Sequence, residues 1–412
     1  MENTLRRVVV TGIGAVTPVG LNAKETWEAL LEGKNGIGPI TSFDTTDFKT
    51  KLAAEVKGFD PHTILEKNDI VKTDRFCQFG IAAAQEAVDD SGFMGTVAPE
   101  RAAVYFGSGI GGIITFGNEQ TKLDQRGPKR VSPYLVPMMI ANMAAGMIAI
   151  RFNCKGAALP AVTACASGSN AIGEALRAIR HGYADVVITG GCEAAIAPVG
   201  VAGFINMQAL SVAEDPNAAS LPFDKRRAGF VIGEGGAALV LEEYEHAKAR
   251  GAKIYAELCG YGSTCDAHHI TAPDPEADGA SRAIKQALEE ADYTENDKVY
   301  VNAHGTGTPL NDKSETKAVK LSLGEKAKDA LISSTKSMTG HMLGAAGAIE
   351  AIVCVKALQE GIIPPTINLN EPDPECDLNY CPNKAVKADI TLAVSNSLGF
   401  GGHNACVAFR KI

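Results

Sequence analysis

The 412-residue chain lacks both an excess of positive charge and any long hydrophobic run. It carries 48 acidic against 39 basic residues, a formal net charge of -9, which argues against nucleic acid or an anionic membrane as its general partner. No uninterrupted apolar segment approaches the roughly 20 residues that a bilayer-spanning helix needs. The short run Val8–Val10 follows two arginines, but Thr11 and Gly12 interrupt it and no small-residue cleavage site follows. We therefore expect a first β-strand here and a cytoplasmic protein.

The ten cysteines lack the paired short spacings of zinc sites and of disulfide frameworks. Most of them lie in apolar segments, so we expect reduced, buried thiols in a reducing compartment. Only Cys165 has surroundings of a different kind.

Short apolar runs that end in glycine-rich loops recur along the chain and alternate with helix-like stretches. They are continuous in Val and Ile, which is typical of strands covered by helices on both faces. The runs lie at 7–14, 102–109, 184–191, 298–305 and 391–399. This pattern predicts a layered α/β architecture.

Two segments of the chain, Leu159–Gly182 and Leu331–Gly361, resemble each other. Each reads as a strand, a turn of small residues and an amphipathic helix that ends at a glycine. We interpret them as parts of two related halves, and no Ser- or Pro-rich linker separates these halves. The predicted division gives an N-terminal half of residues 1–250 and a C-terminal half of residues 251–412. Insertions that fit neither repeat lie at 41–74 and 119–136.

Cys165 lies between an apolar run and the first repeated helix, in the segment 163–168 (TACASG). Backbone N–H groups and the dipole of a helix start favour a thiolate over a thiol. The tiny neighbours let a substrate approach the sulfur, as covalent catalysis requires. A small buried cysteine at a tight turn is the alternative interpretation of this segment taken alone.

Two of the eight histidines stand between a predicted strand and a loop rich in Gly and Thr. His304 lies in 302–308 (NAHGTGT), and His341 ends 336–341 (KSMTGH) at the start of the second repeated helix. Two imidazoles and one thiolate are suited to acyl transfer coupled to carbanion formation. Core or helix-capping histidines are the alternative.

Four motifs together resemble those of the β-ketoacyl synthase family, in the family's order and over essentially the whole chain. They are TACAS at 163–167, AHGTGTP at 303–309, KSMTGHMLGAAG at 336–347 and SNSLGFGG at 395–402. The resemblance implies the thiolase fold, an α/β fold whose duplicated halves pack as five layers (αβαβα), and a homodimer. It also implies an acyltransferase of the type II branch. Such an enzyme performs the decarboxylative condensation of acyl- and malonyl-[acyl-carrier-protein] in fatty-acid elongation.

The resemblance assigns chemical roles to single residues. Cys165 matches the nucleophile, while His304 and His341 match the pair that promotes malonyl decarboxylation. Lys336 matches a lysine that tunes these histidines, although a structural ion pair with Glu350 describes it equally well.

Further matches concern the binding of the substrate. The backbone N–H groups of Cys165 and Phe400 match an oxyanion hole, and the glycines around Phe400 suit a swinging gate. Thr306 and Thr308 match the hydroxyls that bind the carrier's pantetheine arm. The expected residues of the acyl tunnel and of the cavity mouth are Ile110, Phe204 and His269.

The resemblance implies no organic cofactor. Some family members bind a monovalent cation, sodium or potassium, through groups that correspond to Asn302, Glu350, Ser395 and Asn396. A buried hydrogen-bond network without metal is the alternative for these four residues.

The expected partner is an acidic acyl-carrier protein, yet the insertion segment 65–72 (LEKNDIVK) is mixed in charge. We therefore expect docking to depend on Arg126, Lys129 and Arg130. In 312–315 (DKSE) we expect a helix-start capping pattern rather than an acid/base pair.

Three other proteins of this fold are the rival interpretations. The ketosynthase subunit of a type II polyketide system shares the Cys-His-His set. A non-catalytic chain-length partner typically lacks the cysteine, and a thiolase lacks the paired histidine motifs.

Overall fold

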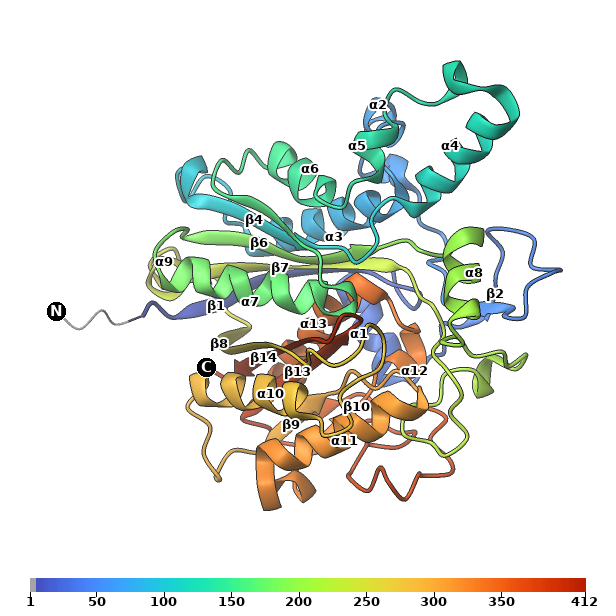
Figure 1. The fold of residues 1–412 in the computed structure, drawn as a ribbon. Helices are drawn as coiled ribbons and strands as arrows, with labels where there is room; N and C mark the ends of the chain where they lie inside the picture. Colours follow the sequence, from blue (N-terminus) through green and yellow to red (C-terminus); the bar gives the residue numbers. More distant parts are fainter. Residues whose placement is uncertain (1–4) are drawn as a thin grey trace.

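The computed structural model describes residues 5–412, and its centre is a mixed sheet of ten strands (Figure 1). The strands are β1 (Val8–Val16), β4 (Ala102–Gly107), β5 (Ala158–Ala161), β6 (Val186–Glu193), β7 (Gly235–Glu243), β8 (Ala256–Cys265), β9 (Val299–Asn302), β10 (Leu331–Ser333), β13 (Leu392–Gly399) and β14 (His403–Arg410). Their spatial order is β10-β9-β13-β14-β8-β1-β7-β6-β4-β5.

The strand order repeats on either side of the β1–β8 junction. In both sets of five strands, the third strand along the chain lies outermost, followed by the second, fourth, fifth and first. The hydrogen-bonded directions repeat as well, with two parallel pairs, β4–β5 and β4–β6, matched by β9–β10 and β9–β13. Only two residue pairs, Val9 with Glu257 and Val10 with Ala256, join the two sets. The chain is therefore built from two copies of one supersecondary pattern.

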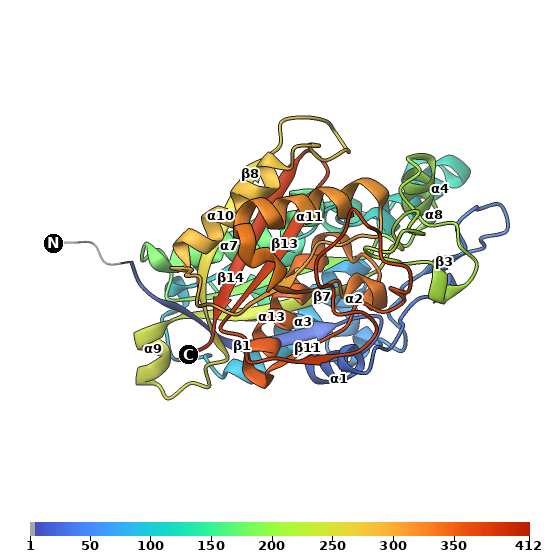
Figure 2. The same ribbon diagram turned by 90° about the horizontal axis from the view of Figure 1, so that it is seen from below.

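Helices separate and cover the two sets of strands. The central pair is α7 (Ser167–Arg180) and α13 (Ala346–Glu360), and one outer face carries α3 (Arg75–Ser91) and α6 (Met143–Arg151). The other outer face carries α10 (Asp278–Glu290) and α11 (Pro309–Leu323), which cross over β13 and β14 in the view from below (Figures 1 and 2). Three apolar clusters fill the spaces between these layers. The predicted five-layer αβαβα fold is confirmed.

The shorter elements connect or decorate these layers. The helices are α1 (Ala23–Leu31), α2 (Lys67–Ile70), α4 (Ile113–Arg126), α5 (Leu135–Met139), α8 (Pro198–Asn206), α9 (Tyr244–Ala249) and α12 (Lys336–Thr339). The short strands are β2 (Gly38–Pro39), β3 (Leu52–Ala53), β11 (Ile362–Ile363) and β12 (Val386–Lys387). The connection between α4 and α5 stands away from the layered body (Figure 1).

The two repeated helices begin and end in the same way. Three residues before each helix a non-glycine residue has a positive φ, 50° at Ala164 and 47° at Leu343. Gly182 and Gly361 follow the helices with φ of 77° and 66°, a conformation that glycine adopts without steric cost. The duplication therefore extends to the backbone of both turns.

The cysteines and the helices agree with the expectations from composition. All ten cysteines lie in the described region and are free, nine of them buried and Cys265 exposed. Among residues 5–412, no helix is long and apolar enough to cross a membrane.

Candidate active site

A single cavity of about 560 Å³ brings the predicted cysteine and both histidines together. Its wall comes from the turns before α7, α11 and α13, from the loop after β8 and from the loop between β13 and β14. The predicted site residues that line it are Cys165, Phe204, His304, Thr306, Thr308, His341 and Phe400. Segments far apart in the sequence therefore meet at one opening between the two halves.

Cys165 is held in a strained turn directly before α7. Ala164 has a φ of 50°, a conformation that non-glycine residues rarely adopt. The Ser167 hydroxyl stabilises this turn, since it accepts from the Thr163 N–H at 2.9 Å and donates to the Ala164 carbonyl at 2.7 Å. The side chain of Cys165 thus projects into the cavity from a fixed backbone, although the residue is only 8% exposed.

The Cys165 sulfur differs from the expected thiolate. Burial raises the pKa of the thiol to about 12, and the nearby positive charge of Lys336 offsets this only in part. Removing the thiolate from water costs more free energy here than its stabilisation by the helix start contributes. The raised pKa favours the thiol at neutral pH and so opposes the ionised sulfur expected from the sequence. Its proton must leave when the sulfur attacks a substrate.

His304 lies in the loop after β9, and a buried carboxylate holds that loop. Glu315 accepts from the backbone N–H groups of His304 and Gly305, both at 2.7 Å. Asp312 accepts from the Gly307 N–H at 3.2 Å in the same loop. The expected capping pattern was therefore wrong: α11 starts at Pro309, and both carboxylates bind the preceding loop instead of capping the helix.

His341 lies before the helix α13 and not at its start. Its backbone N–H donates to the Val231 carbonyl at 2.7 Å, and its carbonyl accepts from the Gly233 N–H at 2.8 Å. The ring packs edge to face against Phe230, with 5.2 Å between the ring centroids. A strand-like pairing with 231–233 therefore fixes this imidazole.

The two imidazoles pack edge to face, and burial favours their uncharged form. Their ring centroids are 5.2 Å apart, with an interplanar angle of 87°. Burial, helped by the charge of Lys336, lowers the pKa of each ring well below its ordinary value. The Nδ1 atoms of both rings are buried and have no hydrogen-bond partner within residues 5–412. Neutral rings can present N–H donors to a developing anion without the cost of a buried charge.

The expected ion pair between Lys336 and Glu350 is present. Both side chains are 1% exposed and in direct contact. Burial raises the pKa of Glu350 to about 7, and Lys336 opposes this shift. Lys336 does not border the cavity, so its charge acts on Cys165 and the histidines through space.

Phe400 closes one side of the cavity within a glycine-rich turn. Gly401 and Gly402 have φ of 89° and 76°, which suits glycine. A Cβ atom added to Gly399 would lie only 3.3 Å from the amide nitrogen of Cys165. The Phe400 ring contacts Phe204, with ring centroids 6.5 Å apart. The Phe400 turn therefore lies directly beside the backbone of Cys165.

Comparison with known families decides the family of this arrangement. A model described as "Beta-ketoacyl synthase, N-terminal domain" matches residues 5–247, and its C-terminal counterpart matches residues 255–370. The chain belongs to the β-ketoacyl synthase family.

Similar proteins resemble the synthase over nearly its whole length. A "3-oxoacyl-[acyl-carrier-protein] synthase 2" of Synechocystis is 51% identical over 408 residues, and one of Staphylococcus aureus is 49% identical over 407, each covering 98% of both chains. A solved β-ketoacyl synthase of Burkholderia phymatum is 36% identical, with a TM-score of 0.92 over 99% of this chain and 100% of that chain. A ketosynthase solved with its type II polyketide acyl-carrier protein is 34% identical, with a TM-score of 0.91 at the same coverage.

Two predicted substrate residues of the synthase lie outside this cavity. Ile110 is 36% exposed, and its backbone N–H donates to Glu193 at 3.3 Å. His269 is exposed and accepts from the N–H groups of Thr271 and Ala272, both at 3.1 Å. The structure therefore corrects the expectation that His269 lines the mouth: its ring folds onto its own loop, and Ile270 and Thr271 border the cavity.

The four residues expected to hold a cation each carry a buried oxygen without a hydrogen-bond partner in the described region. Ser395 lies opposite Asn302 in the pairing of β13 with β9, and Asn396 follows it. The buried oxygens without a hydrogen-bond partner in the described region include Asn302 Oδ1, Glu350 Oε2, Ser395 Oγ and Asn396 Oδ1. Such orphan acceptors are costly unless a donor or a cation satisfies them. Within the same region, no group of three His, Cys, Asp or Glu side chains is arranged to hold a metal ion.

Glu193 is a site residue that the sequence analysis missed. Its carboxylate is fully buried at the end of β6 and accepts from the N–H groups of Gly109 at 2.7 Å and Gly344 at 3.1 Å, and from the Ser108 hydroxyl at 3.0 Å. It thus joins the first half of the synthase to the turn before α13. An acidic residue that ends a continuous apolar strand was the available sequence signal, because such a group needs several donors.

Proposed function

We propose that the chain is a type II 3-oxoacyl-[acyl-carrier-protein] synthase of fatty-acid elongation. It condenses an acyl-carrier thioester with a malonyl-carrier thioester and releases a β-ketoacyl-carrier protein. The observation that carries this proposal is one cavity that presents a buried cysteine opposite two uncharged histidines. A nucleophile and neutral N–H donors in a water-poor site suit acyl transfer followed by carbanion chemistry.

In the first step, the Cys165 sulfur attacks the carbonyl carbon of the acyl-carrier thioester. The thiol proton leaves as the carbon–sulfur bond forms and passes to the departing carrier sulfur, so both imidazoles stay uncharged. The backbone N–H groups of Cys165 and Phe400 hold the negative oxygen of the intermediate. The carrier thiolate leaves and is protonated, and the acyl group remains on Cys165.

In the second step, His304 and His341 bind the thioester carbonyl of the malonyl group. Loss of carbon dioxide leaves the electron pair of the broken carbon–carbon bond in an enolate, which the imidazole N–H groups stabilise. The enolate carbon attacks the acyl-Cys165 carbonyl and expels the cysteine thiolate. The product is two carbons longer, and the thiolate recovers a proton for the next cycle.

The remaining residues support these two steps. Burial keeps both histidines neutral, and the buried charge of Lys336 adds to this because it disfavours a second positive charge nearby. Thr306 and Thr308 face the cavity and offer hydroxyls to the pantetheine arm. Phe400 moves when the acyl chain enters between Phe204 and Cys165.

Intact-mass spectrometry after incubation with acyl-carrier donors of graded length tests the function directly. We expect a mass increase equal to one acyl group on Cys165. The fraction of acylated protein should be largest with long-chain donors. A polyketide ketosynthase would instead load short starter units. The absence of any acyl adduct would contradict the proposal. The higher identity to the fatty-acid synthases, 51% and 49% against 34% for the polyketide ketosynthase, favours long chains.

We propose that the carrier protein docks on the connection between α4 and α5. Arg126, Lys129 and Arg130 are exposed there, and none of them forms an ion pair with another described residue. Reversing the charge of Lys129 and Arg130 to glutamate should raise the KM for acyl-carrier protein about tenfold and leave kcat unchanged. The KM for free acyl-pantetheine is the control and should not change. An unchanged carrier KM would eliminate this patch.

We propose that the synthase is a homodimer joined along β5. This strand ends the ten-strand sheet, and Leu159 and Val162 beside its free edge are 49% and 54% exposed. Tyr183, which is 78% exposed, borders the same region. An exposed strand edge with apolar neighbours favours pairing with a second copy. Sedimentation equilibrium at micromolar concentration should give twice the chain mass, and a monomer would refute the dimer.

We propose that a monovalent cation, and no organic cofactor, binds to Asn302, Glu350, Ser395 and Asn396. The site offers three neutral oxygens and one carboxylate oxygen, that of Glu350. Because Glu350 already pairs with Lys336, this set suits sodium or potassium better than a divalent ion. The cation would hold β9, β13 and α13 together. Replacing potassium and sodium by a large organic cation should lower the melting temperature by a few degrees, and no shift would favour the metal-free network.

A further inference from the structure

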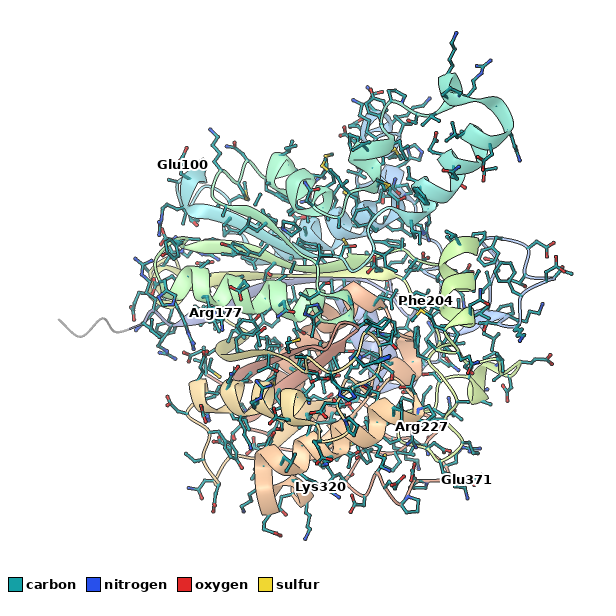
Figure 3. The ribbon with its side chains drawn as sticks, viewed as in Figure 1. Glu100, Arg177, Phe204, Arg227, Lys320 and Glu371 are labelled. Atoms are coloured by element: carbon teal, nitrogen blue, oxygen red, sulfur yellow. The ribbon has the colours of Figure 1, made fainter. Side chains whose placement is uncertain are left out.

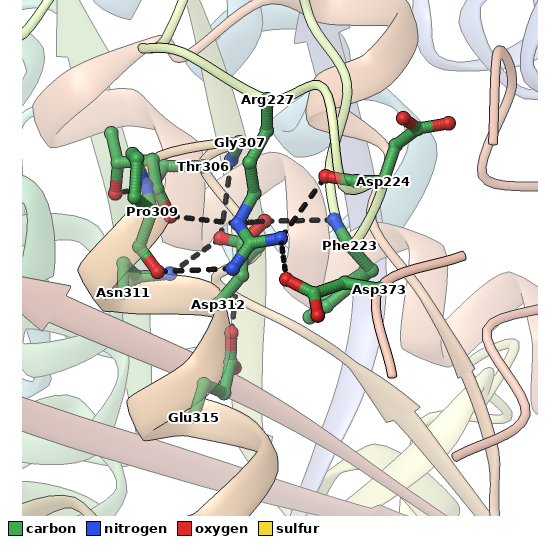
Figure 4. A network of polar contacts seen from close by, with 12 residues as sticks. Phe223, Asp224, Arg227, Thr306, Gly307, Pro309, Asn311, Asp312, Glu315 and Asp373 are labelled. Atoms are coloured by element: carbon green, nitrogen blue, oxygen red, sulfur yellow. Dashed lines mark hydrogen bonds and ion pairs between the residues drawn. The ribbon is translucent and has the colours of Figure 1, made fainter. Parts of the chain in front are cut away.

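The guanidinium of Arg227 lies buried between the two halves, next to the loop that carries His304 and both threonines (Figure 4). Its side chain is 5% exposed, and it comes from the N-terminal half on the same side of the molecule as Phe204 (Figure 3). The AHGTGTP loop at 303–309 belongs to the C-terminal half. Arg227 therefore reaches across the junction, and the two-step mechanism above does not use it.

Arg227 holds the carbonyl groups of that loop directly. Its Nε donates to the Thr308 carbonyl at 3.3 Å, and its Nη2 donates to the Pro309 carbonyl at 3.1 Å. A backbone hydrogen bond of 3.1 Å from the Gly229 N–H to the Gly307 carbonyl adds a third link. Three consecutive carbonyls, those of residues 307–309, are thus bound from the segment 227–229. Arg227 supplies two of the three bonds.

Two carboxylates fix the guanidinium in this position. Asp373 accepts from Nη1 at 2.5 Å, and Asp312 lies 3.7 Å from Nε. Asp312 also accepts from the Gly307 N–H at 3.2 Å and from the Phe223 N–H at 2.8 Å. The same buried carboxylate therefore orients both the arginine and the loop. A planar group with five donors can serve these partners at once, which a lysine ammonium cannot do with its single nitrogen.

One of the held carbonyls belongs to Thr308, whose hydroxyl faces the cavity, and the Gly307 carbonyl lies between Thr306 and Thr308 in the chain. The Thr306 and Thr308 hydroxyls are 2.9 Å apart, and both residues line the cavity with Cys165. The peptide that follows Thr308 cannot rotate freely while its carbonyl is bound. A shift of about 1 Å in such a pair is enough to weaken a bound substrate strongly.

We propose that Arg227 is a positioning residue for the pantetheine arm: it holds the Thr308 and Pro309 carbonyls and thereby orients the Thr306 and Thr308 hydroxyls toward the arm. This inference rests on the proposed function, because the threonine pair must be the binding site of the arm. Arg227 itself touches neither the substrate nor Cys165.

Replacing Arg227 by lysine tests the inference, since the charge is kept and the forked donors are lost. We expect the KM for acyl-pantetheine to rise about tenfold with kcat changed less than twofold. The rate of Cys165 alkylation by iodoacetamide should stay at the wild-type value, because that reagent does not use the arm. A purely structural arginine would lower the melting temperature without this separation of KM from kcat.

A double-mutant cycle identifies the path of the effect. Valine at positions 306 and 308 removes both hydroxyls and keeps their shape. In that background, the change Arg227→Lys should alter the KM for acyl-pantetheine less than twofold, because the groups it orients are gone. A full tenfold effect in the valine background, or an unchanged KM in the single variant, would overturn the inference.

The neighbouring Arg226 is the matched control. It binds Asp224, whose backbone carbonyl also accepts from Arg227, but it forms no hydrogen bond or ion pair with the 303–309 loop. The variant Arg226→Lys should keep the wild-type KM. Turnover of the wild type with acyl- and malonyl-pantetheine is measured first. If the wild type does not condense them, this result contradicts the proposed function and does not bear on the role of Arg227.

Discussion

Replacing Cys165 by alanine is expected to abolish condensation, with a loss of about 10³-fold or more in turnover, the size of effect seen when a covalent nucleophile is removed. The reason is that no other described cysteine lines the cavity, so the acyl group has no alternative acceptor there. The measurement is formation of β-ketoacyl product together with intact mass, which should show no acyl adduct. Alanine fills less space than cysteine, and the strained turn at Ala164 is retained.

Glutamine at the same position should separate the two half-reactions. Its amide carbonyl is expected to occupy the place of the acyl-thioester carbonyl, so the neighbouring N–H groups are satisfied as in the acylated protein. We expect malonyl-carrier decarboxylation to continue while condensation stops. Cys154→Ala is a control, because Cys154 is buried in an outer cluster away from the cavity. An acyl adduct that persists in the alanine variant would show that another residue is the nucleophile, and it would contradict the role of Cys165.

His304→Ala is expected to lower malonyl decarboxylation by about 10²–10³-fold, the usual cost of losing one donor to a developing oxyanion. Acylation of Cys165 should continue, since the sulfur and the adjoining N–H groups stay in place. Carbon dioxide release and acyl-adduct mass measure the two events separately. The wild-type rate of decarboxylation, measured between pH 6.5 and 8, is the reference for the variant.

The pH dependence of decarboxylation follows from the direction of the histidine shifts. The pKa values of His304 and His341 lie well below 6.5, so the active neutral rings persist at and above that pH. Protonation, and with it the loss of decarboxylation, is expected only below the ordinary histidine pKa. A rate that falls by half near pH 6.5 would mean that the rings are not shielded as described. His62→Ala, an exposed histidine, should behave as the wild type.

Residues whose position depends on a short local segment of the chain were predictable from the sequence. The turn around Cys165 and the loops around His304 and His341 are short segments of small residues next to strands or helices, so local sequence indicated where each side chain would emerge. The repeat between 159–182 and 331–361 also predicted the duplicated fold, because helix and strand periodicity is a local property.

Groups that depend on distant partners were not predictable in the same way. Glu315 looked like a helix cap, although it binds the His304 loop. Glu193 and Arg227 carry contacts that cross between the two halves, and neither stands in a motif. His269 was expected at the cavity, but hydrogen bonds within its own loop turn it aside.

The sequence by itself determined the duplicated α/β architecture, the family, and the identity of one cysteine and two histidines as the chemical set. The tertiary structure alone decided the direction of their pKa shifts: burial raises the pKa of Cys165 and lowers the pKa of both imidazoles. The physical reason is that a pKa depends first on lost water, and the core that buries these three groups comes from other parts of the chain. Local sequence contains the groups, whereas the packing of the two halves sets their charge.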